Sequence, residues 1–85
     1  MVPMTDIKVS ILFFGVTADV VGKRAIEMLL ERPVKSADVF RQVTDRYPTL
    51  NDHRLLFAFN QEYSTGNEIV CDGDELAIFS AVSGG

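Results

Sequence analysis

The carboxyl-terminal residues of the chain are small, and their types and positions suggest a chemical role. Residues 80–85 read SAVSGG, so the chain closes on Gly84 and Gly85. Glycine has no β-carbon, and two consecutive glycines can enter a channel that is too narrow for other residues. Fully extended, residues 81–85 would reach about 17 Å from the body of the protein. We therefore predict that Gly85 presents its α-carboxylate to the active site of a partner protein.

The chemistry open to such a carboxylate is acyl transfer after activation. A free carboxylate is a poor acyl donor, but ATP can convert it to an acyl-adenylate that a thiol, a persulfide or an amine attacks. The sequence has no phosphate-binding loop and no nucleophile–base pair, so we expect a partner to supply the activating site. A single cysteine, Cys71, and a single histidine, His53, provide neither a disulfide nor a zinc site, and we expect no metal.

Length and charge narrow the classes of partner. The 85 residues fit one domain, and 47% hydrophobic with 24% charged residues is typical of a folded one. The net charge is −4 and the basic residues are scattered, so the sequence favours a basic protein partner over nucleic acid. No apolar run is long enough to span a membrane. Because the chain has one cysteine and no apolar leader after a basic start, the expected compartment is the cytosol.

The first half of the chain predicts two strands and a helix that would help to position this tail. Residues 6–14 alternate apolar side chains on one face, which predicts a strand, and residues 15–22 (GVTADVVG) predict a loop. Residues 23–32 favour the returning strand of a hairpin, although their Met, Leu, Glu and Arg residues also permit a helix. Ser36 is the expected N-cap of the main helix, which should end at Tyr47 because a proline follows.

The second half of the chain predicts strands. Residues 54–60 (RLLFAFN) and 75–80 (ELAIFS) are strongly apolar, and turn signals flank a short strand expected at residues 68–71. One helix covers one face of a sheet, and the first and last strands can pair in parallel across the long middle of the chain. We therefore predict an α+β fold, a ubiquitin-like β-grasp with a four- to five-stranded mixed sheet and one main helix. Residues 1–80 should form the domain, and residues 81–85 a flexible tail.

Three of the predicted strands carry large apolar residues on both faces, which is more than one helix can bury. The surplus consists of Leu12 and Phe14, part of the 55–59 run, and Ala77 with Phe79. Either loops and a curled sheet cover it, or the open face binds a partner. We favour a partner, because large apolar patches usually mark contacts and aromatic residues dominate interface energies. The candidate interface residues are Phe79, Phe14, Phe57 and Phe59.

Four stretches of the sequence have the pattern of a known family. They are ILFFGVTADVVG (residues 11–22), YP (47–48), FAFNQEY (57–63) and DGDELAIFSAVSGG (72–85). The last is the most specific, because it joins an acidic glycine turn, an apolar strand and a V-S-G-G ending. Over essentially its whole length the chain resembles the small subunit of molybdopterin synthase, a ubiquitin-like sulfur carrier.

The resemblance implies a cycle in which other proteins act on this chain. An ATP-using activating enzyme would adenylate Gly85, and a sulfur donor would convert the adenylate to a thiocarboxylate. The tail would then enter the large synthase subunit, with Gly84 behind the reactive end and Ser83 and Val82 in the mouth of the channel. Sulfur would pass there to cyclic pyranopterin monophosphate and build the dithiolene that holds molybdenum. The resemblance also implies a heterotetramer with two copies of each subunit, in which this chain binds no cofactor of its own.

One departure from the family is visible in the tail. Many relatives have two prolines where this chain has Ser80 and Ala81, so the tail is expected to be looser and to lose more entropy on docking.

Other functions stay open at this point. The same tail chemistry serves ubiquitin-like modifiers that form isopeptide bonds to lysines, and sulfur carriers for thiamine or tRNA thiolation. A pure interaction module with an incidental Gly-Gly ending is the remaining alternative.

Overall fold

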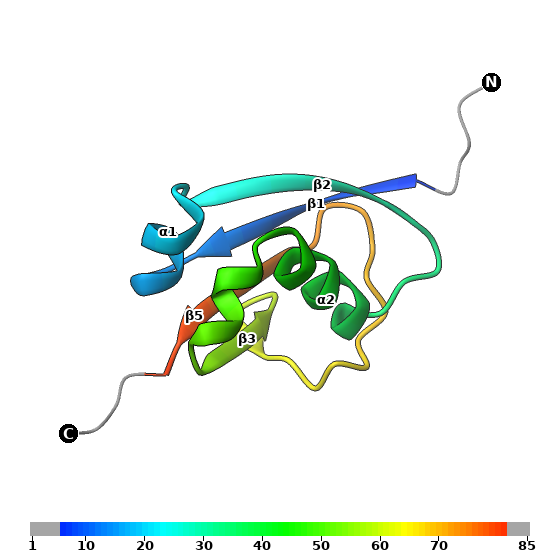
Figure 1. The fold of residues 1–85 in the computed structure, drawn as a ribbon. Helices are drawn as coiled ribbons and strands as arrows, with labels where there is room; N and C mark the ends of the chain where they lie inside the picture. The colour runs from blue at the N-terminus through cyan, green and yellow to red at the C-terminus, as the bar shows by residue number, and fades with distance from the viewer. Residues whose placement is uncertain (1–5, 82–85) are drawn as a thin grey trace.

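The computed structural model describes residues 6–81. Along this part of the chain the elements are β1 (Asp6–Phe13), α1 (Val16–Val21), β2 (Ala25–Glu31), α2 (Ser36–Arg46), the 3-10 helix η1 (Pro48–Asp52), β3 (Leu55–Phe59), β4 (Glu62–Tyr63) and β5 (Glu75–Ser80). The strands form one sheet in the order β2-β1-β5-β3-β4, in which β1 and β5 are parallel and the other neighbours antiparallel (Figure 1). The predicted α+β fold, with a five-stranded mixed sheet and one main helix, is confirmed.

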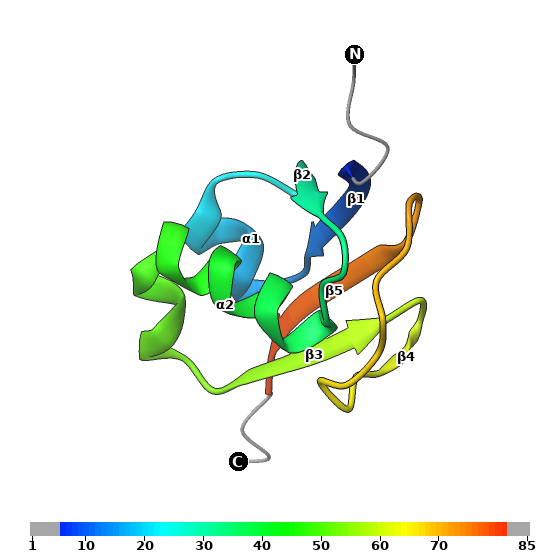
Figure 2. The same ribbon diagram turned by 90° about the vertical axis from the view of Figure 1, so that its right-hand side faces the viewer.

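The core lies between the sheet and α2. The apolar residues of α2 recur every three to four positions, so that Val39, Phe40 and Val43 share one face, and all three are buried. They meet the alternate residues of the central strands, such as Ile11 of β1 and Ile78 of β5, which are completely buried. Figure 2 shows α2 and η1 on the same side of the sheet. The other side of the sheet is therefore open along β1, β5 and β3 in the described part of the chain.

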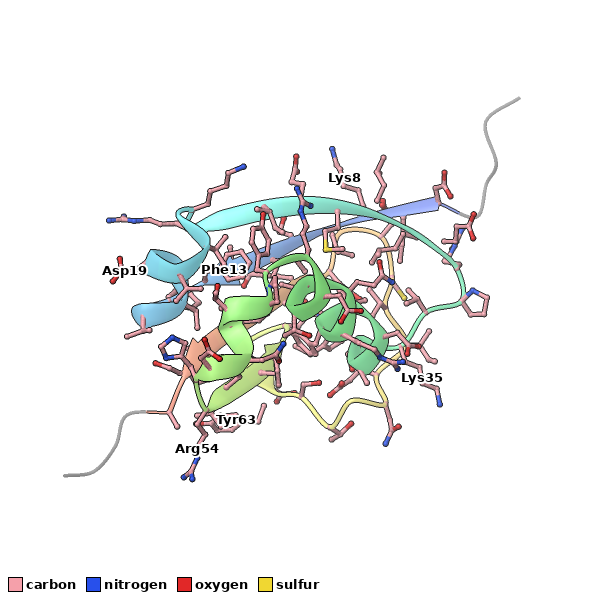
Figure 3. The ribbon with its side chains drawn as sticks, in the orientation of Figure 1. Lys8, Phe13, Asp19, Lys35, Arg54 and Tyr63 are labelled. Atoms are coloured by element: carbon pink, nitrogen blue, oxygen red, sulfur yellow. The ribbon has the colours of Figure 1, made fainter. Side chains whose placement is uncertain are left out.

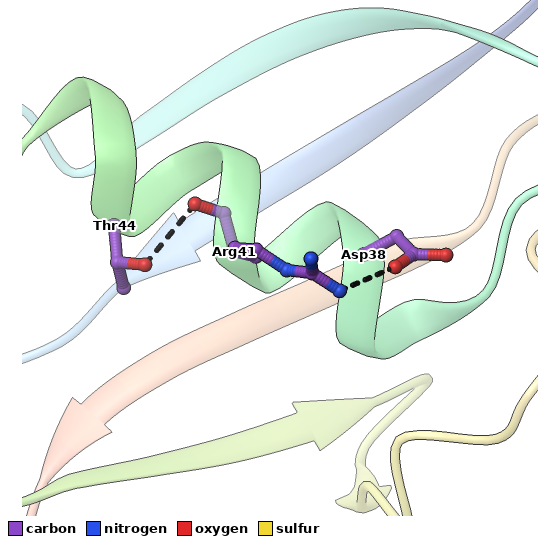
Figure 4. A network of polar contacts seen from close by, with 3 residues as sticks. All are labelled: Asp38, Arg41 and Thr44. Carbon is purple, nitrogen blue, oxygen red and sulfur yellow. Dashed lines mark hydrogen bonds and ion pairs between the residues drawn. The ribbon is translucent and has the colours of Figure 1, made fainter.

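The solvent-facing side of α2 carries polar residues that contribute little to stability. The Arg41 guanidinium donates to the Asp38 carboxylate at 2.8 Å, and the Thr44 hydroxyl donates to the Arg41 carbonyl oxygen at 3.1 Å (Figure 4). An exposed ion pair of this kind is worth less than about 1 kcal/mol.

No helix within residues 6–81 is long and apolar enough to cross a membrane.

The hairpin predicted for residues 23–32 is confirmed, but the loop predicted before it is wrong. β2 pairs antiparallel with β1, whereas residues 16–21 form the short helix α1. Gly15 and Gly22 flank this helix with φ values of 60° and 81°, in the region that favours glycine. Two glycines seven positions apart are typical of a loop, but here they are the turns at which a six-residue helix begins and ends.

The short strand before β5 also lies elsewhere than predicted. Residues 68–71 form no strand and contribute a single bridge, between Lys35 and Ile69. The extra strand is β4, which pairs with β3 through a tight turn at Asn60 and Gln61. Both turn residues have positive φ, 49° and 72°, as a two-residue hairpin turn of type I′ requires. The sequence offered no glycine at this turn, which is why the hairpin was not predicted.

The start of α2 is held by a carboxylate from a distant loop. Ser36 was the predicted N-cap, but it is the first helical residue. The N-cap is Lys35. The buried Ser36 hydroxyl donates to the Glu68 carboxylate, which also accepts from the Ser64 hydroxyl at 2.7 Å and the Thr65 amide at 2.9 Å. We call this arrangement the Glu68 clamp. Its Ser36 hydrogen bond is the main reason that the pKa of Glu68 falls from 4.5 to about 2, with Ser64 and Thr65 adding to the effect and partial burial opposing it.

The Glu68 clamp makes stability depend on pH in the acid range. A folded-state pKa below the unfolded value means that the stabilisation is complete above about pH 4.5 and is lost as the pH falls toward 2. We expect Glu68→Gln to lower the free energy of unfolding at pH 7 by about 1–2 kcal/mol, because charge-assisted hydrogen bonds are lost. Urea unfolding at pH 7 and pH 3 measures this, and the difference from the wild type should shrink at pH 3. Glu31→Gln removes the same charge from an exposed strand position and is the control. Equal effects of the two substitutions at both pH values would contradict the clamp.

Candidate functional site

The tail predicted to be reactive leaves the domain from a central strand. β5 lies between β1 and β3, and it ends at Ser80. The Ala81 amide still donates to the Arg54 carbonyl oxygen at 2.8 Å, beyond the end of the strand. Arg54 precedes β3, and Figure 3 shows it on the β3 side of the end of β5. The remaining predicted tail residues, Val82, Ser83, Gly84 and Gly85, lie outside the described residues.

The beginning of β5 is fixed by the acidic turn that precedes it. The Asp72 carboxylate accepts from the Lys8 amide at 2.8 Å, and the Asp74 carboxylate accepts from the Cys71 amide at 2.7 Å. Gly73, with a φ of 87°, permits the tight turn between them. The two acids therefore hold their own backbone and β1, and the predicted turn is confirmed.

The open face of the sheet carries an apolar depression of about 610 Å³. Its residues come from β1, β3, β4 and β5 and from the loops that follow β1 and β3. They are Leu12, Phe14, Ala58, Gln61, Glu62, Tyr63, Glu75, Ala77 and Phe79. We call this surface the apolar hollow. It lies on the strand from which the tail leaves, since Ala77 and Phe79 belong to β5.

The apolar hollow is built from the side chains that α2 cannot reach. Alternation places Leu12 and Ala77 opposite one another on the open face, because they are paired in the β1–β5 register. Phe14 is 51% exposed and Tyr63 73% exposed, so both rings are open to contact with a partner. The Tyr63 and Phe79 rings lie 6.2 Å apart, so they form one aromatic surface. The hollow therefore has the anchors that a protein interface uses.

Phe57 and Phe59 do not belong to this surface, which corrects the predicted interface set. In the β3–β5 register Phe57 is opposite the buried Ile78, and Phe59 is opposite the buried Leu76. Both side chains pack against the core, and the Phe57 ring lies 4.4 Å from that of Phe40 on α2. Because neighbouring residues of a strand face opposite sides, Leu56 and Ala58 take the open face instead.

Several residues of the hollow were not predicted. Tyr63, labelled in Figure 3, reaches the surface through the unforeseen strand β4. Gln61, Glu62 and Glu75 add a polar and acidic rim to the apolar floor. No feature of the sequence marks these rim residues, because the turn at residues 60–61 decides which side chains reach the hollow.

The hollow and the tail together suit docking and delivery. Among residues 6–81 no group of three or more histidine, cysteine, aspartate or glutamate side chains is placed to hold a metal ion. Cys71 is exposed and unpaired, and it lies at the other end of β5 from the tail. The described side chains can thus hold a partner with an apolar surface and a basic edge. A reactive group would have to come from the tail.

Comparison with known proteins agrees with this arrangement. The ThiS family model matches residues 11–85. The human molybdopterin synthase sulfur carrier subunit is 31% identical over 100% of both chains, and that of Escherichia coli K12 is 34% identical over 91% of this chain and 99% of its own. Among solved structures, the crystal structure of SAMP1 from Haloferax volcanii superposes with a TM-score of 0.79 and 26% identity, covering 92% of this chain and 99% of that one.

The match extends over nearly the whole chain and includes the parts that build the site. It includes the end of β1 from residue 11, the residues of the apolar hollow and β5, and it continues to residue 85. Two curated relatives above 30% identity align over 100% and 91% of the chain. The chain therefore belongs to the ThiS family, in which its similar curated relatives are molybdopterin synthase sulfur carrier subunits.

Proposed function

We propose that this chain is the sulfur carrier subunit of a molybdopterin synthase. The observation that carries the proposal is the end-to-end similarity to curated carriers of that name, 31% identical over 100% of both chains in the human case. The sheet order supports it, because the tail follows a strand held on both sides. Such a strand gives the tail a fixed point of departure.

The chemistry of the proposal takes place at Gly85. An activating enzyme transfers AMP from ATP to the Gly85 carboxylate and releases pyrophosphate, and attack by a sulfur donor then displaces AMP. A sulfide donor gives the thiocarboxylate directly, whereas a persulfide donor gives an acyl disulfide whose sulfur–sulfur bond a thiol must then reduce. The thiocarboxylate sulfur forms a bond to a carbon of the substrate. Water then hydrolyses the bond between this sulfur and the Gly85 carbonyl carbon, which returns the carboxylate and leaves one sulfur on the substrate for each chain. The proposed substrate is cyclic pyranopterin monophosphate, which gains the two sulfurs of the molybdopterin dithiolene. ATP belongs to the activating enzyme, and this chain binds no cofactor.

The partners are proposed to dock on the apolar hollow. Phe14 and Phe79 with Tyr63 supply aromatic anchors, and Glu62 and Glu75 supply the acidic rim. The large synthase subunit would take the hollow during sulfur transfer, in an assembly of two copies of each subunit in the cytosol. The activating enzyme would use the same face, so that the two partners alternate. Gly84, Ser83 and Val82 would occupy the channel that leads to either active site.

A second candidate function is covalent modification of other proteins. The observation in its favour is the similarity to SAMP1 of Haloferax volcanii, whose name stands for small archaeal modifier protein 1. In that case a lysine amine, in place of a sulfur donor, would attack the adenylated or thioester-linked Gly85. Both functions use the same tail and the same hollow, and they differ in the acceptor.

Reconstitution separates the two functions. The purified chain is incubated with the activating enzyme, ATP and a sulfur donor, and then with the large subunit and cyclic pyranopterin monophosphate. The carrier function predicts that molybdopterin forms, that its formation requires ATP, and that no lysine conjugates appear on denaturing gels. Isopeptide-linked ladders without molybdopterin would favour the modifier.

A further inference from the structure

Thr17 is a buried polar residue at the point where the tail leaves the sheet. Within residues 6–81 two polar side chains are completely buried, those of Ser36 and Thr17, and Ser36 belongs to the Glu68 clamp. Thr17 lies in the first turn of α1. Its hydroxyl oxygen is 2.8 Å from the carbonyl oxygen of Ile78, which is 61 positions away in the chain. Figure 1 shows α1 at the end of the molecule where β5 finishes.

The Thr17 hydroxyl completes a small network with Phe14 and Ile78. Its oxygen lies 2.7 Å from the Phe14 carbonyl oxygen and accepts from the Phe14 amide at 3.0 Å. A hydroxyl has one proton to donate, and the Phe14 carbonyl already accepts from the Thr17 amide at 3.3 Å. The Ile78 carbonyl oxygen likewise accepts from the Phe14 amide, at 3.2 Å. Donation from the Thr17 hydroxyl to Ile78 therefore adds a second hydrogen bond to that carbonyl group, from a residue outside the sheet.

Ile78 is the residue at which β5 loses its neighbour on the β1 side. The parallel pairing ends at Phe13 and Ile78, whereas the antiparallel pairing with β3 continues to Leu55 and Ser80. Residues 78–81, which we call the tail root, are thus held by β3 and Arg54 on one side. The Thr17 network holds their first carbonyl group on the other side.

Packing alone does not call for a hydroxyl at this position. Valine has nearly the same shape, and burying a hydroxyl costs free energy unless it is hydrogen-bonded. The hydroxyl therefore matters for the bond that it makes across the chain. We propose that Thr17 is a positioning residue that fixes the direction in which the tail leaves the sheet, so that Gly85 is delivered in register after a partner has docked. The consequence at Gly85 rests on the proposed function, but the anchoring of the tail root does not.

The anchoring is tested by amide hydrogen exchange in the full chain. Thr17→Val removes the hydroxyl and keeps the shape, and Thr17→Ser keeps the hydroxyl. We expect Thr17→Val to speed exchange of the Ala81 amide by about tenfold more than it speeds that of Ile11, which lies between β2 and β5 and reports global opening. Thr17→Ser should restore the wild-type ratio. An unchanged ratio in Thr17→Val overturns the proposal.

Delivery is tested with the activating enzyme, by measuring ATP–pyrophosphate exchange against the concentration of the chain. Thr17→Val should lower kcat by about tenfold with KM within about twofold of the wild type, because docking is intact and alignment is lost. Val43→Ala, which weakens the core under α2, is the control for stability and should leave kcat unchanged at a temperature where it is folded. A wild-type kcat in Thr17→Val, or an equal loss in Val43→Ala, overturns the role in delivery. If the wild-type chain is not adenylated at all, the proposed function fails, and the exchange ratio still decides the anchoring.

Discussion

Removing Gly85 is expected to abolish sulfur transfer while leaving the folded domain and its docking unchanged. Transfer to the pterin substrate should fall at least about a thousandfold, because the reacting carbonyl must approach within about 3–3.5 Å of its partner and one missing residue withdraws it by about 3.5 Å. The free energy of unfolding should change by less than about 0.5 kcal/mol, since substitutions away from core features have small effects. The core lies between the sheet and α2, and residue 85 follows the end of β5 at Ser80.

The measurement compares single-turnover transfer with binding for the same variant. The deletion should bind the large subunit with an affinity within about threefold of the wild type, because the anchors lie in the apolar hollow. A chain with one alanine added after Gly85 is the matched control: it keeps both glycines and still moves the carboxylate out of place. Wild-type transfer by either variant would contradict the role of Gly85.

Placing a charge in the apolar hollow is expected to release the partners without unfolding the protein. Phe79 is half-buried on the open face of β5, and its ring lies 6.2 Å from that of Tyr63. Phe79→Asp should weaken binding of the large subunit about a hundredfold, because it removes an aromatic anchor and leaves a carboxylate without a partner in the interface. The acidic rim of Glu62 and Glu75 would add repulsion.

Leu29→Asp is the matched control for this substitution. Leu29 is an apolar residue of β2, is 74% exposed, and is not part of the hollow. The affinity of Leu29→Asp for the large subunit should be within about twofold of that of the wild type, since a single exposed leucine is ordinary on a protein surface. Calorimetric titration measures both affinities, and thermal unfolding checks that both variants are folded. Equal weakening by the two substitutions, or none by Phe79→Asp, would move the interface away from the hollow.

The strands that carry the site could be predicted because their sequences alternate or end at clear turns. β1 shows Ile7, Val9, Ile11 and Phe13 on one face, and all four are buried. The excess of apolar residues on the second face of β1 and β5 then predicted the hollow. Phe14 and Phe79 do lie there.

The face of β3 could not be predicted from its sequence. All five residues of Leu55–Phe59 are apolar and half-buried. The sequence therefore shows no alternation of apolar and polar residues that would tell which face is buried. The register with β5 decides the matter, and it turns Phe57 and Phe59 toward α2. When every residue of a strand is apolar, its pairing with neighbouring strands decides which face is buried.

The short helix and the two buried hydroxyl networks depend on contacts between distant parts of the chain. Thr17 bonds to Ile78, and Ser36 bonds to Glu68, over separations of 61 and 32 residues. Local propensity carries no information about such partners, and α1 is too short to show a helical period. Both networks support the ends of elements, where backbone groups lack partners within the element.

The most direct test of the account is the intact mass of the chain after activation. The chain is incubated with its activating enzyme, ATP and a sulfur donor, and the mass of the intact protein is measured by mass spectrometry. Conversion of the Gly85 carboxylate to a thiocarboxylate predicts a species about 16 Da heavier, which disappears when the large subunit and the pterin substrate are added. Fragmentation should place the added mass on Gly85. An activating enzyme that consumes ATP with a known carrier but leaves this chain at its original mass would contradict the central claim.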